Sequence, residues 1–97
     1  MSQYQISPSA SRDLNDISEY FLLQNIAAGE RFFQEFNRKC KYLNQFPYMG
    51  KSYGPLLTDL RGFPLDGYII LYRTGGETVE ILRVVHGRQD LEELFRN

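Results

Sequence analysis

Hydrophobic residues recur at helical spacing through the first half of the chain. A short alternating run, Tyr4-Gln5-Ile6, predicts a first strand, after which Ser7 and Pro8 suit a helix N-cap and first helical position. The helix that follows has one apolar stripe, formed by Ala10, Leu14, Ile17 and Phe21. Its opposite face carries Arg12, Asp16 and Glu19. The pattern predicts a surface helix with one buried side.

A second helix is expected from Ile26 to about Gln45, after a tight turn at Gln24-Asn25. Its stripe consists of Phe32, Phe36, Cys40 and Leu43, widened by Phe33. Pro47 ends it, because proline disfavours helical geometry in the preceding residue. Two long helices joined by so short a turn form an antiparallel αα-hairpin.

The second half of the chain predicts a loop, three strands and a short helix. Residues 48–55 contain two glycines and a proline and are interpreted as a loop. Strands are expected at about residues 56–63, 67–73 and 78–86, with Thr74-Gly75-Gly76-Glu77 as a hairpin turn. A closing helix is marked by Leu91, Leu94 and Phe95.

The order β-α-α-β-β-β-α predicts an α+β domain, in which the helical hairpin packs on a mainly antiparallel four-stranded sheet. Strict alternation in the last strand sets Val79, Ile81, Arg83 and Val85 against Glu80, Leu82, Val84 and His86. Both faces are largely apolar, and the hairpin can cover only one of them. The other face must be covered by the closing helix, a partner chain, or both.

Composition narrows the class of protein. The 97 residues suffice for one domain with one core, and 42% are hydrophobic. The net charge is −1, with 11 basic and 12 acidic residues, which argues against binding nucleic acid mainly through phosphate neutralisation. We therefore expect no direct sequence-specific contact with nucleic acid.

The single cysteine excludes an intrachain disulfide. Cys40 falls on an apolar helical stripe and is interpreted as a small buried hydrophobe rather than a reactive thiol. The N-terminus lacks the pattern of a signal peptide, and no apolar run reaches membrane-spanning length. A soluble cytoplasmic protein is expected.

Motifs for common catalytic chemistry are weak in this sequence. Serine, histidine and aspartate are present without the spacing of a serine hydrolase. One histidine and one cysteine, distant in sequence, do not suggest a zinc site. Gly75-Gly76 lies in a hairpin rather than between a strand and a helix, which disfavours phosphate binding. Neither a metal nor a cofactor is expected.

Arginines are the more informative residues. Those on or beside the expected sheet are Arg61, Arg73, Arg83 and Arg88. Arg83 lies among aliphatic residues, where a guanidinium needs a specific partner. That partner is either an internal carboxylate such as Asp59 or Glu92, or a carboxylate of another chain.

His86 closes the last strand and is interpreted as a residue that hydrogen-bonds the turn, with a catalytic imidazole as the alternative. Gly87 is expected to adopt a backbone conformation closed to other residues. Asp90 suits the start of the closing helix as a cap. Among the aromatic series Phe32, Phe33 and Phe36, mostly core, one member can face outward as an anchor for a partner.

Several of these segments, taken in order, resemble the ParE branch of the RelE/ParE toxin superfamily. They are Ile6-Ser7-Pro8, Ala27-Ala28, Phe46-Pro47 with Gly50, Leu60-Arg61-Gly62-Phe63-Pro64, Tyr68-Ile69-Ile70-Leu71-Tyr72, and the run from Ile81 through Arg83, His86-Gly87-Arg88 and Asp90 to Leu91. The resemblance implies a toxin of a type II toxin–antitoxin system, with a ParD-like antitoxin as partner in a hetero-oligomer.

Two activities occur on this fold, so the fold alone does not decide between them. RelE-like members cleave mRNA on the ribosome with basic residues and a tyrosine or histidine in the sheet cleft, whereas ParE-like members poison DNA gyrase by protein–protein contact. The lysine-bearing strand of the RelE type falls on residues 57–59, its cleft arginine on Ile69, and its closing tyrosine near Leu94 or Phe95. Only Arg88 keeps a basic cleft position.

We therefore expect a non-enzymatic gyrase poison that an antitoxin neutralises. Its candidate antitoxin contacts are Arg61, Arg73, Arg83 and Arg88. The alternative is a ribosome-dependent endoribonuclease that uses Arg61, Arg83, His86 and Arg88. A second alternative is an inactive relative that only binds its antitoxin.

Overall fold

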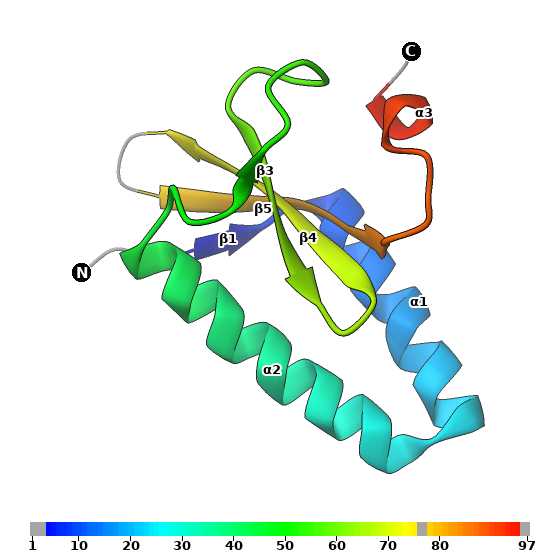
Figure 1. Ribbon diagram of the computed structural model, residues 1–97. Helices are drawn as coiled ribbons and strands as arrows, with labels where there is room; N and C mark the ends of the chain where they lie inside the picture. The colour runs from blue at the N-terminus through cyan, green and yellow to red at the C-terminus, as the bar shows by residue number, and fades with distance from the viewer. Residues whose placement is uncertain (1–3, 76–77, 96–97) are drawn as a thin grey trace.

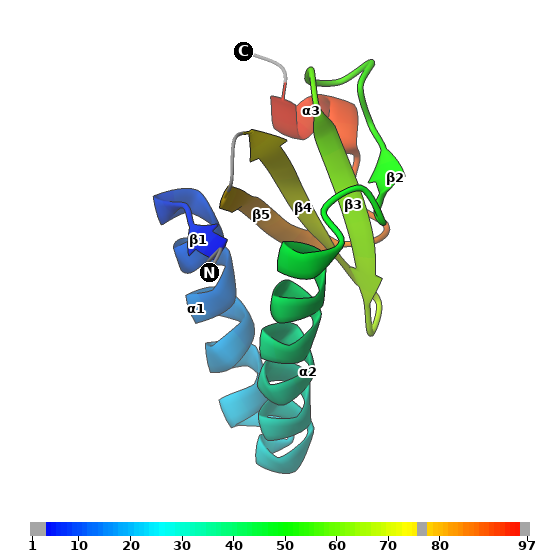
Figure 2. The same cartoon turned by 90° about the vertical axis from the view of Figure 1, so that its left-hand side faces the viewer.

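The computed structural model describes residues 4–75 and 78–95. Its elements are β1 (Tyr4–Ile6), α1 (Pro8–Gln24), α2 (Ile26–Gln45), β2 (Lys51–Ser52), β3 (Leu60–Leu65), β4 (Tyr68–Gly75), β5 (Thr78–His86) and α3 (Leu91–Phe95). The two long helices lie on one face of the sheet, and α3 lies on the other (Figures 1 and 2). The α+β class, the helical hairpin and the closing helix are confirmed.

Local capping explains where the helices begin. The Ser7 hydroxyl accepts a hydrogen bond from the Ala10 backbone N–H at 3.1 Å, with Pro8 at the first helical position. Asn25 ends α1, and its side-chain Oδ1 accepts from the Ala28 N–H at 3.0 Å at the start of α2. One polar residue therefore serves both helix ends at the predicted turn.

The sheet has five strands, one more than predicted, in the order β1-β5-β4-β3-β2. β1 pairs parallel to β5, and the other pairs are antiparallel. The extra strand, Lys51–Ser52, lies inside the segment that was expected to be a loop. It pairs with Gly62 and Arg61 of β3. β3 begins at Leu60 rather than near residue 56, because residues 53–60 form turns held by bonds such as Leu60 N–H to Leu57 O. The tip of the expected hairpin turn, residues 76–77, lies outside the described residues.

The predicted alternation of β5 is wrong beyond Ile81. Leu71 pairs with Arg83 and the next residue, Tyr72, pairs with Ile81, so Leu82 is the extra residue of a β-bulge. A bulge shifts the following side chains to the opposite face. Val84 therefore joins Ile81 in the core under the helices, whereas Val85 belongs to the other face.

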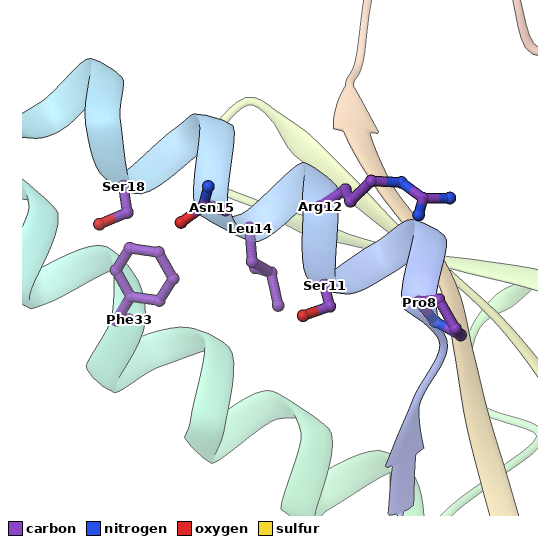
Figure 3. Close-up of a pocket in the computed structure, with 7 residues that line it drawn as sticks. All are labelled: Pro8, Ser11, Arg12, Leu14, Asn15, Ser18 and Phe33. Carbon is purple, nitrogen blue, oxygen red and sulfur yellow. The ribbon is translucent and has the colours of Figure 1, made fainter.

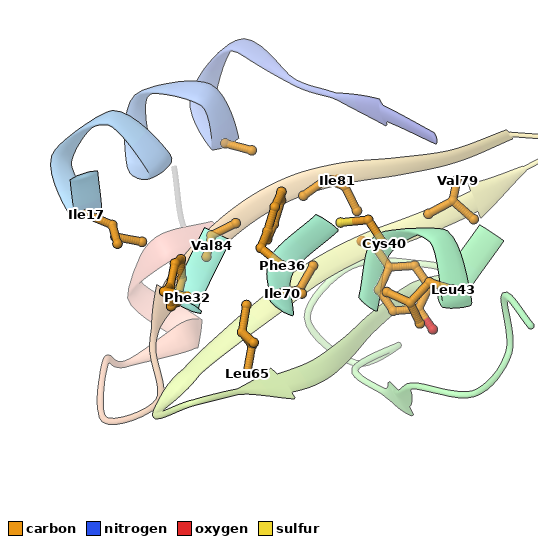
Figure 4. Packing of buried hydrophobic residues seen from close by; sticks show 12 residues of the cluster. Ile17, Phe32, Phe36, Cys40, Leu43, Leu65, Ile70, Val79, Ile81 and Val84 are labelled. Atoms are coloured by element: carbon orange, nitrogen blue, oxygen red, sulfur yellow. The ribbon is translucent and has the colours of Figure 1, made fainter. Parts of the chain in front are cut away.

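Two hydrophobic cores result, one on each face of the sheet. The larger fills the space between the helices and the sheet and contains the predicted stripe residues Phe32, Phe36, Cys40 and Leu43 (Figure 4). The smaller is built on Leu60, Leu71 and Val85 and is covered by α3 and by residues 53–57. α3 covers the second face as expected, and the loop contributes as well.

Candidate partner-binding surfaces

Arg83 forms an internal ion pair at the edge of β5. Its Nε and Nη2 donate to Asp13 Oδ2 and Oδ1 at 2.7 and 2.9 Å, and their side chains are 28% and 14% exposed. This bond raises the pKa of Arg83. The expected internal partners, Asp59 and Glu92, were wrong: the partner comes from α1.

The Asp13 carboxylate also binds the backbone of β5 at the edge of the sheet. β1 accompanies β5 only as far as Ile81, so the rest of β5 is an edge with unpaired backbone groups. Asp13 Oδ2 also accepts from the Val84 N–H at 2.9 Å, and the Ser7 hydroxyl donates to Leu82 O at 2.9 Å. Side chains at the start of α1 therefore complete the edge that β1 leaves open.

Arg61 is also engaged within the chain. Its Nη1 donates to the carbonyls of Gly50 at 2.8 Å and Tyr48 at 3.2 Å, and its guanidinium lies 5.1 Å from the centre of the Tyr48 ring. Arg61 pairs across the sheet with Tyr72, which belongs to the core under the helices. Because cross-strand partners share a face, Arg61 lies on the helical side.

Arg73 and Arg88 are the more accessible arginines. Arg73 is opposite Leu60, which is in the core under α3, so it lies on the face away from the helices. It approaches Glu80 at 4.0 Å, with both side chains 44% exposed, and such a pair contributes little to stability. Arg88 is exposed in the turn between β5 and α3. Arg61 and Arg73 therefore lie on opposite faces of the sheet, Arg83 at its edge and Arg88 in a turn, and the four arginines form no single cluster.

His86 serves the turn that follows it. The Arg88 backbone N–H donates to His86 Nδ1 at 3.3 Å, and the imidazole lies edge-on to the Tyr68 ring with centroids 5.4 Å apart. The expectation for Gly87 was wrong, since Gly67 is the described glycine with positive φ. At Gly87 space is the constraint, because a Cβ would lie 3.1 Å from Gly67 O. Asp90 caps the closing helix as predicted, by accepting from the Glu92 N–H at 3.1 Å.

A shallow groove runs between α1 and α2, with Leu14 and Phe33 directed into it (Figure 3). Phe33 is half-buried, whereas Phe32 and Phe36 are buried, so Phe33 is the member of the aromatic series that reaches the surface. Polar side chains from α1 rim the groove, namely Ser11, Arg12, Asn15 and Ser18.

Other apolar side chains are exposed. At the hairpin tip they are Tyr20, Leu22, Leu23 and Ile26, and at the end of α2 they are Tyr42, Phe46, Tyr48 and Met49. Tyr20, Leu22 and Leu23 lie off the predicted apolar stripe of the first helix, which agrees with their exposure. For the residues of the loop after α2, only the packed structure shows which apolar side chains are exposed.

Cys40 is fully buried, and burial raises its pKa to about 12. This confirms its reading as a small hydrophobe, because a thiol held protonated is a poor nucleophile. Within residues 4–75 and 78–95, no group of histidine, cysteine or acidic side chains is arranged to hold a metal ion. Over the same ranges, no helix is long and apolar enough to cross a membrane.

Comparison with known proteins places this geometry in a family. The family model for the ParE toxin of the type II toxin–antitoxin system parDE matches residues 4–91. Toxin ParE3 of Caulobacter vibrioides is 41% identical over 49 residues, which are 50% of this chain and 49% of that protein, so the chain spans about half the length of this curated relative.

A solved structure, the chromosomal ParDE TA system from P. aeruginosa, has the same fold, with a TM-score of 0.73 at 19% sequence identity. The match covers 89% of this chain and 96% of that one. The range matched by the family model, residues 4–91, spans α1, α2 and all five strands, and so contains the positions of Asp13 and Arg83. The protein therefore belongs to the ParE toxin family of type II toxin–antitoxin systems.

Proposed function

We propose that this chain is a cytoplasmic toxin that inhibits DNA gyrase by protein–protein binding and is neutralised by a ParD-like antitoxin. Family membership supports the toxin role, and the sheet supports the choice of gyrase over mRNA. A nuclease of the RelE type needs cationic and acid–base groups converging on one phosphate. In this chain, the positions that correspond to those cationic and acid–base groups are mostly occupied by apolar side chains that pack on one another.

Most of those positions pack against the hydrophobic core under α3, whereas Thr58 and Asp59 are exposed and neither is basic. Leu57, Ile69, Leu94 and Phe95 all pack against the buried cluster of Leu60, Leu71 and Val85. Residues that pack together to exclude water do not offer charge to a phosphorane. Apolar packing at the positions that correspond to the RelE-type catalytic cleft is the observation that carries the proposal.

The decisive experiment compares the two targets directly. Purified protein is titrated into supercoiling and cleavage assays with DNA gyrase, and in parallel into a translation reaction whose mRNA is analysed by primer extension. We expect inhibition of gyrase supercoiling and accumulation of trapped cleavage complexes, both reaching a maximum at about one toxin per gyrase binding site. The mRNA should stay intact. Fully active gyrase with cut mRNA would refute the proposal. Activity in neither assay, with antitoxin binding retained, would indicate the inactive relative.

Antitoxin contacts are proposed at Arg61, Arg73, Arg83 and Arg88. Arg73 and Arg88 are the most accessible to carboxylates of a partner, whereas Arg61 and Arg83 already hold internal acceptors.

Replacing the exposed Arg88 by alanine is expected to weaken antitoxin binding by about 2 kcal/mol or more, as for loss of a charge-paired anchor. Arg83→Ala is expected to weaken binding less, because the Arg83 guanidinium is already paired with Asp13. Calorimetry with a ParD-like antitoxin measures both effects, with the exposed Arg31→Ala of α2 as control. An unchanged affinity in Arg88→Ala would exclude Arg88 as an antitoxin anchor.

A further inference from the structure

The segment after α2 presents an apolar surface that the fold holds in place. Phe46, Tyr48 and Met49 are 53%, 70% and 45% exposed, and Tyr42 on the last turn of α2 is 43% exposed. With Gln45 and Pro47 they line a groove where α2 ends and the chain turns toward β2, the green segment in Figure 1. We call these residues the aromatic–methionine groove.

Hydrogen bonds from the sheet fix the backbone beneath this groove. The buried Tyr72 hydroxyl donates to Pro47 O at 2.8 Å and accepts from the Gly50 N–H at 2.9 Å. Arg61 holds the carbonyls of Tyr48 and Gly50. With the backbone groups turned inward to these partners, the side chains of Tyr48 and Met49 are left facing outward.

Gly50 is required for this arrangement. A Cβ at that position would lie 2.6 Å from the Tyr72 hydroxyl and 2.8 Å from Gly62 O. The backbone of the loop therefore lies in direct contact with the sheet at Gly50. A surface whose exposed anchors are held rigidly loses little conformational entropy when a partner binds.

Positive charge adjoins the groove. A second groove, lined by Arg38, Lys39, Lys41 and Phe63, shares Tyr42 and Gln45 with the first. Arg38 is neutralised by Glu35 at 2.7 Å, but Lys39 and Lys41 are not so paired in the described part of the chain. Among the described lining residues of both grooves there is no carboxylate. The combined surface is apolar at one end and cationic at the other, in a protein of net charge −1.

We infer that the aromatic–methionine groove and its lysine rim form a docking site for an acidic amphipathic segment of another polypeptide. Aromatic or aliphatic side chains of that segment fill the groove, and its carboxylates meet Lys39 and Lys41. Methionine and aromatic residues are the usual apolar components of such peptide grooves. The site is separate from Arg73 and Arg88, and it does not depend on gyrase being the target.

The ring geometry favours a polypeptide over single-stranded nucleic acid. Bases need free aromatic faces for stacking. Here the Arg61 guanidinium lies over the Tyr48 ring at 5.1 Å, and Tyr42 and Phe46 meet edge to face with centroids 5.2 Å apart. A groove that also contains Met49 and Pro47 suits branched and aromatic side chains better than a row of bases.

A random library of 16-residue peptides, displayed and selected on the immobilised full-length protein, tests the inference. We expect the selected peptides to combine aromatic or aliphatic residues with an excess of Asp and Glu. Fluorescence anisotropy is expected to show affinities that fall about tenfold or more in the double variant Phe46→Ser/Met49→Ser, or on charge reversal in Lys39→Glu.

Two further variants make the test specific. Leu23→Ser, at the hairpin tip where Leu23 is 84% exposed, removes a similar apolar surface elsewhere and is expected to leave affinity unchanged. Tyr72→Phe keeps every groove side chain but removes the hydroxyl that holds the loop, and is expected to weaken binding while circular dichroism shows a folded protein. Peptides that bind the Phe46/Met49 variant as well as the unaltered protein, or that carry no acidic excess, would overturn the inference. Binding of a dT20 oligonucleotide that depends on Tyr48, in place of peptide, would do the same.

Discussion

The Asp13 carboxylate offers the sharpest test of how the sheet edge is stabilised. It accepts three hydrogen bonds, two from Arg83 at 2.7 and 2.9 Å and one from the Val84 N–H at 2.9 Å. Replacing Asp13 by alanine removes all three and leaves a guanidinium and a backbone donor without their acceptor. The loss therefore exceeds that of an ordinary surface ion pair.

The magnitude follows from the partial burial of the pair. Exposed pairs contribute about 0–1 kcal/mol, whereas breaking a fully buried pair costs about 3–5 kcal/mol. With side chains 28% and 14% exposed, the Arg83–Asp13 pair falls between these limits. Adding about 1 kcal/mol for the Val84 donor, we expect Asp13→Ala to lower the free energy of unfolding by about 2–3 kcal/mol. For a domain of this size, that lowers Tm by about 10–20 °C.

Urea unfolding followed by circular dichroism measures the effect, in a double-mutant cycle with Arg83→Ala. The single Arg83→Ala change is expected to cost less, because Asp13 still accepts from Val84. Asp13→Asn keeps an acceptor for that N–H and is expected to lie between wild type and Asp13→Ala. The exposed Asp16→Ala of the same helix is the control and should stay within about 0.5 kcal/mol. A coupling energy below about 0.3 kcal/mol would refute the reasoning.

Three further predictions concern the loop after α2 and the core. Tyr72→Phe is expected to lower the free energy of unfolding by about 1–3 kcal/mol, because it leaves the Gly50 N–H and the Pro47 carbonyl unsatisfied. It should also speed hydrogen exchange at the Gly50 amide, and an unchanged exchange rate would count against the role of the hydroxyl. Gly50→Ala is expected to lower stability by about 1–3 kcal/mol in urea unfolding through its clash with the Tyr72 hydroxyl, and wild-type stability would contradict the packing. Burial raises the pKa of Cys40 to about 12. Between the unfolded thiol pKa of about 9 and that value only the folded state keeps the proton, so stability should fall as pH rises above about 9. Cys40→Ala should flatten that fall, and an unchanged pH profile would argue against a buried thiol.

Helix positions were predictable because their determinants are local. Ser7, Pro8 and Asn25 act on backbone groups within a few residues, and the apolar stripes of both helices require only the helical period. The bounds of α2 and the extent of β5 agree with the pattern for the same reason. The resemblance that suggested the family rests on such runs, and the match over residues 4–91 confirmed it.

The features that the sequence missed depend on pairs of residues far apart in the chain. The bulge at Leu82 arises where β5 pairs with β4, so the pattern of residues within β5 alone does not predict it. Lys51–Ser52 is a strand only because β3 lies beside it.

Arginine positions illustrate the same division at the candidate site. The sequence alone determined that Arg83 needs a specific partner, because a guanidinium among aliphatic residues is costly without one. Only the tertiary structure decided that this partner is Asp13, 70 positions earlier in the chain, and that Arg61, a candidate contact by sequence, is held by the carbonyls of Tyr48 and Gly50. The physical reason is that composition and spacing specify what each side chain requires, whereas the packing of helices and strands determines which group comes near enough to supply it.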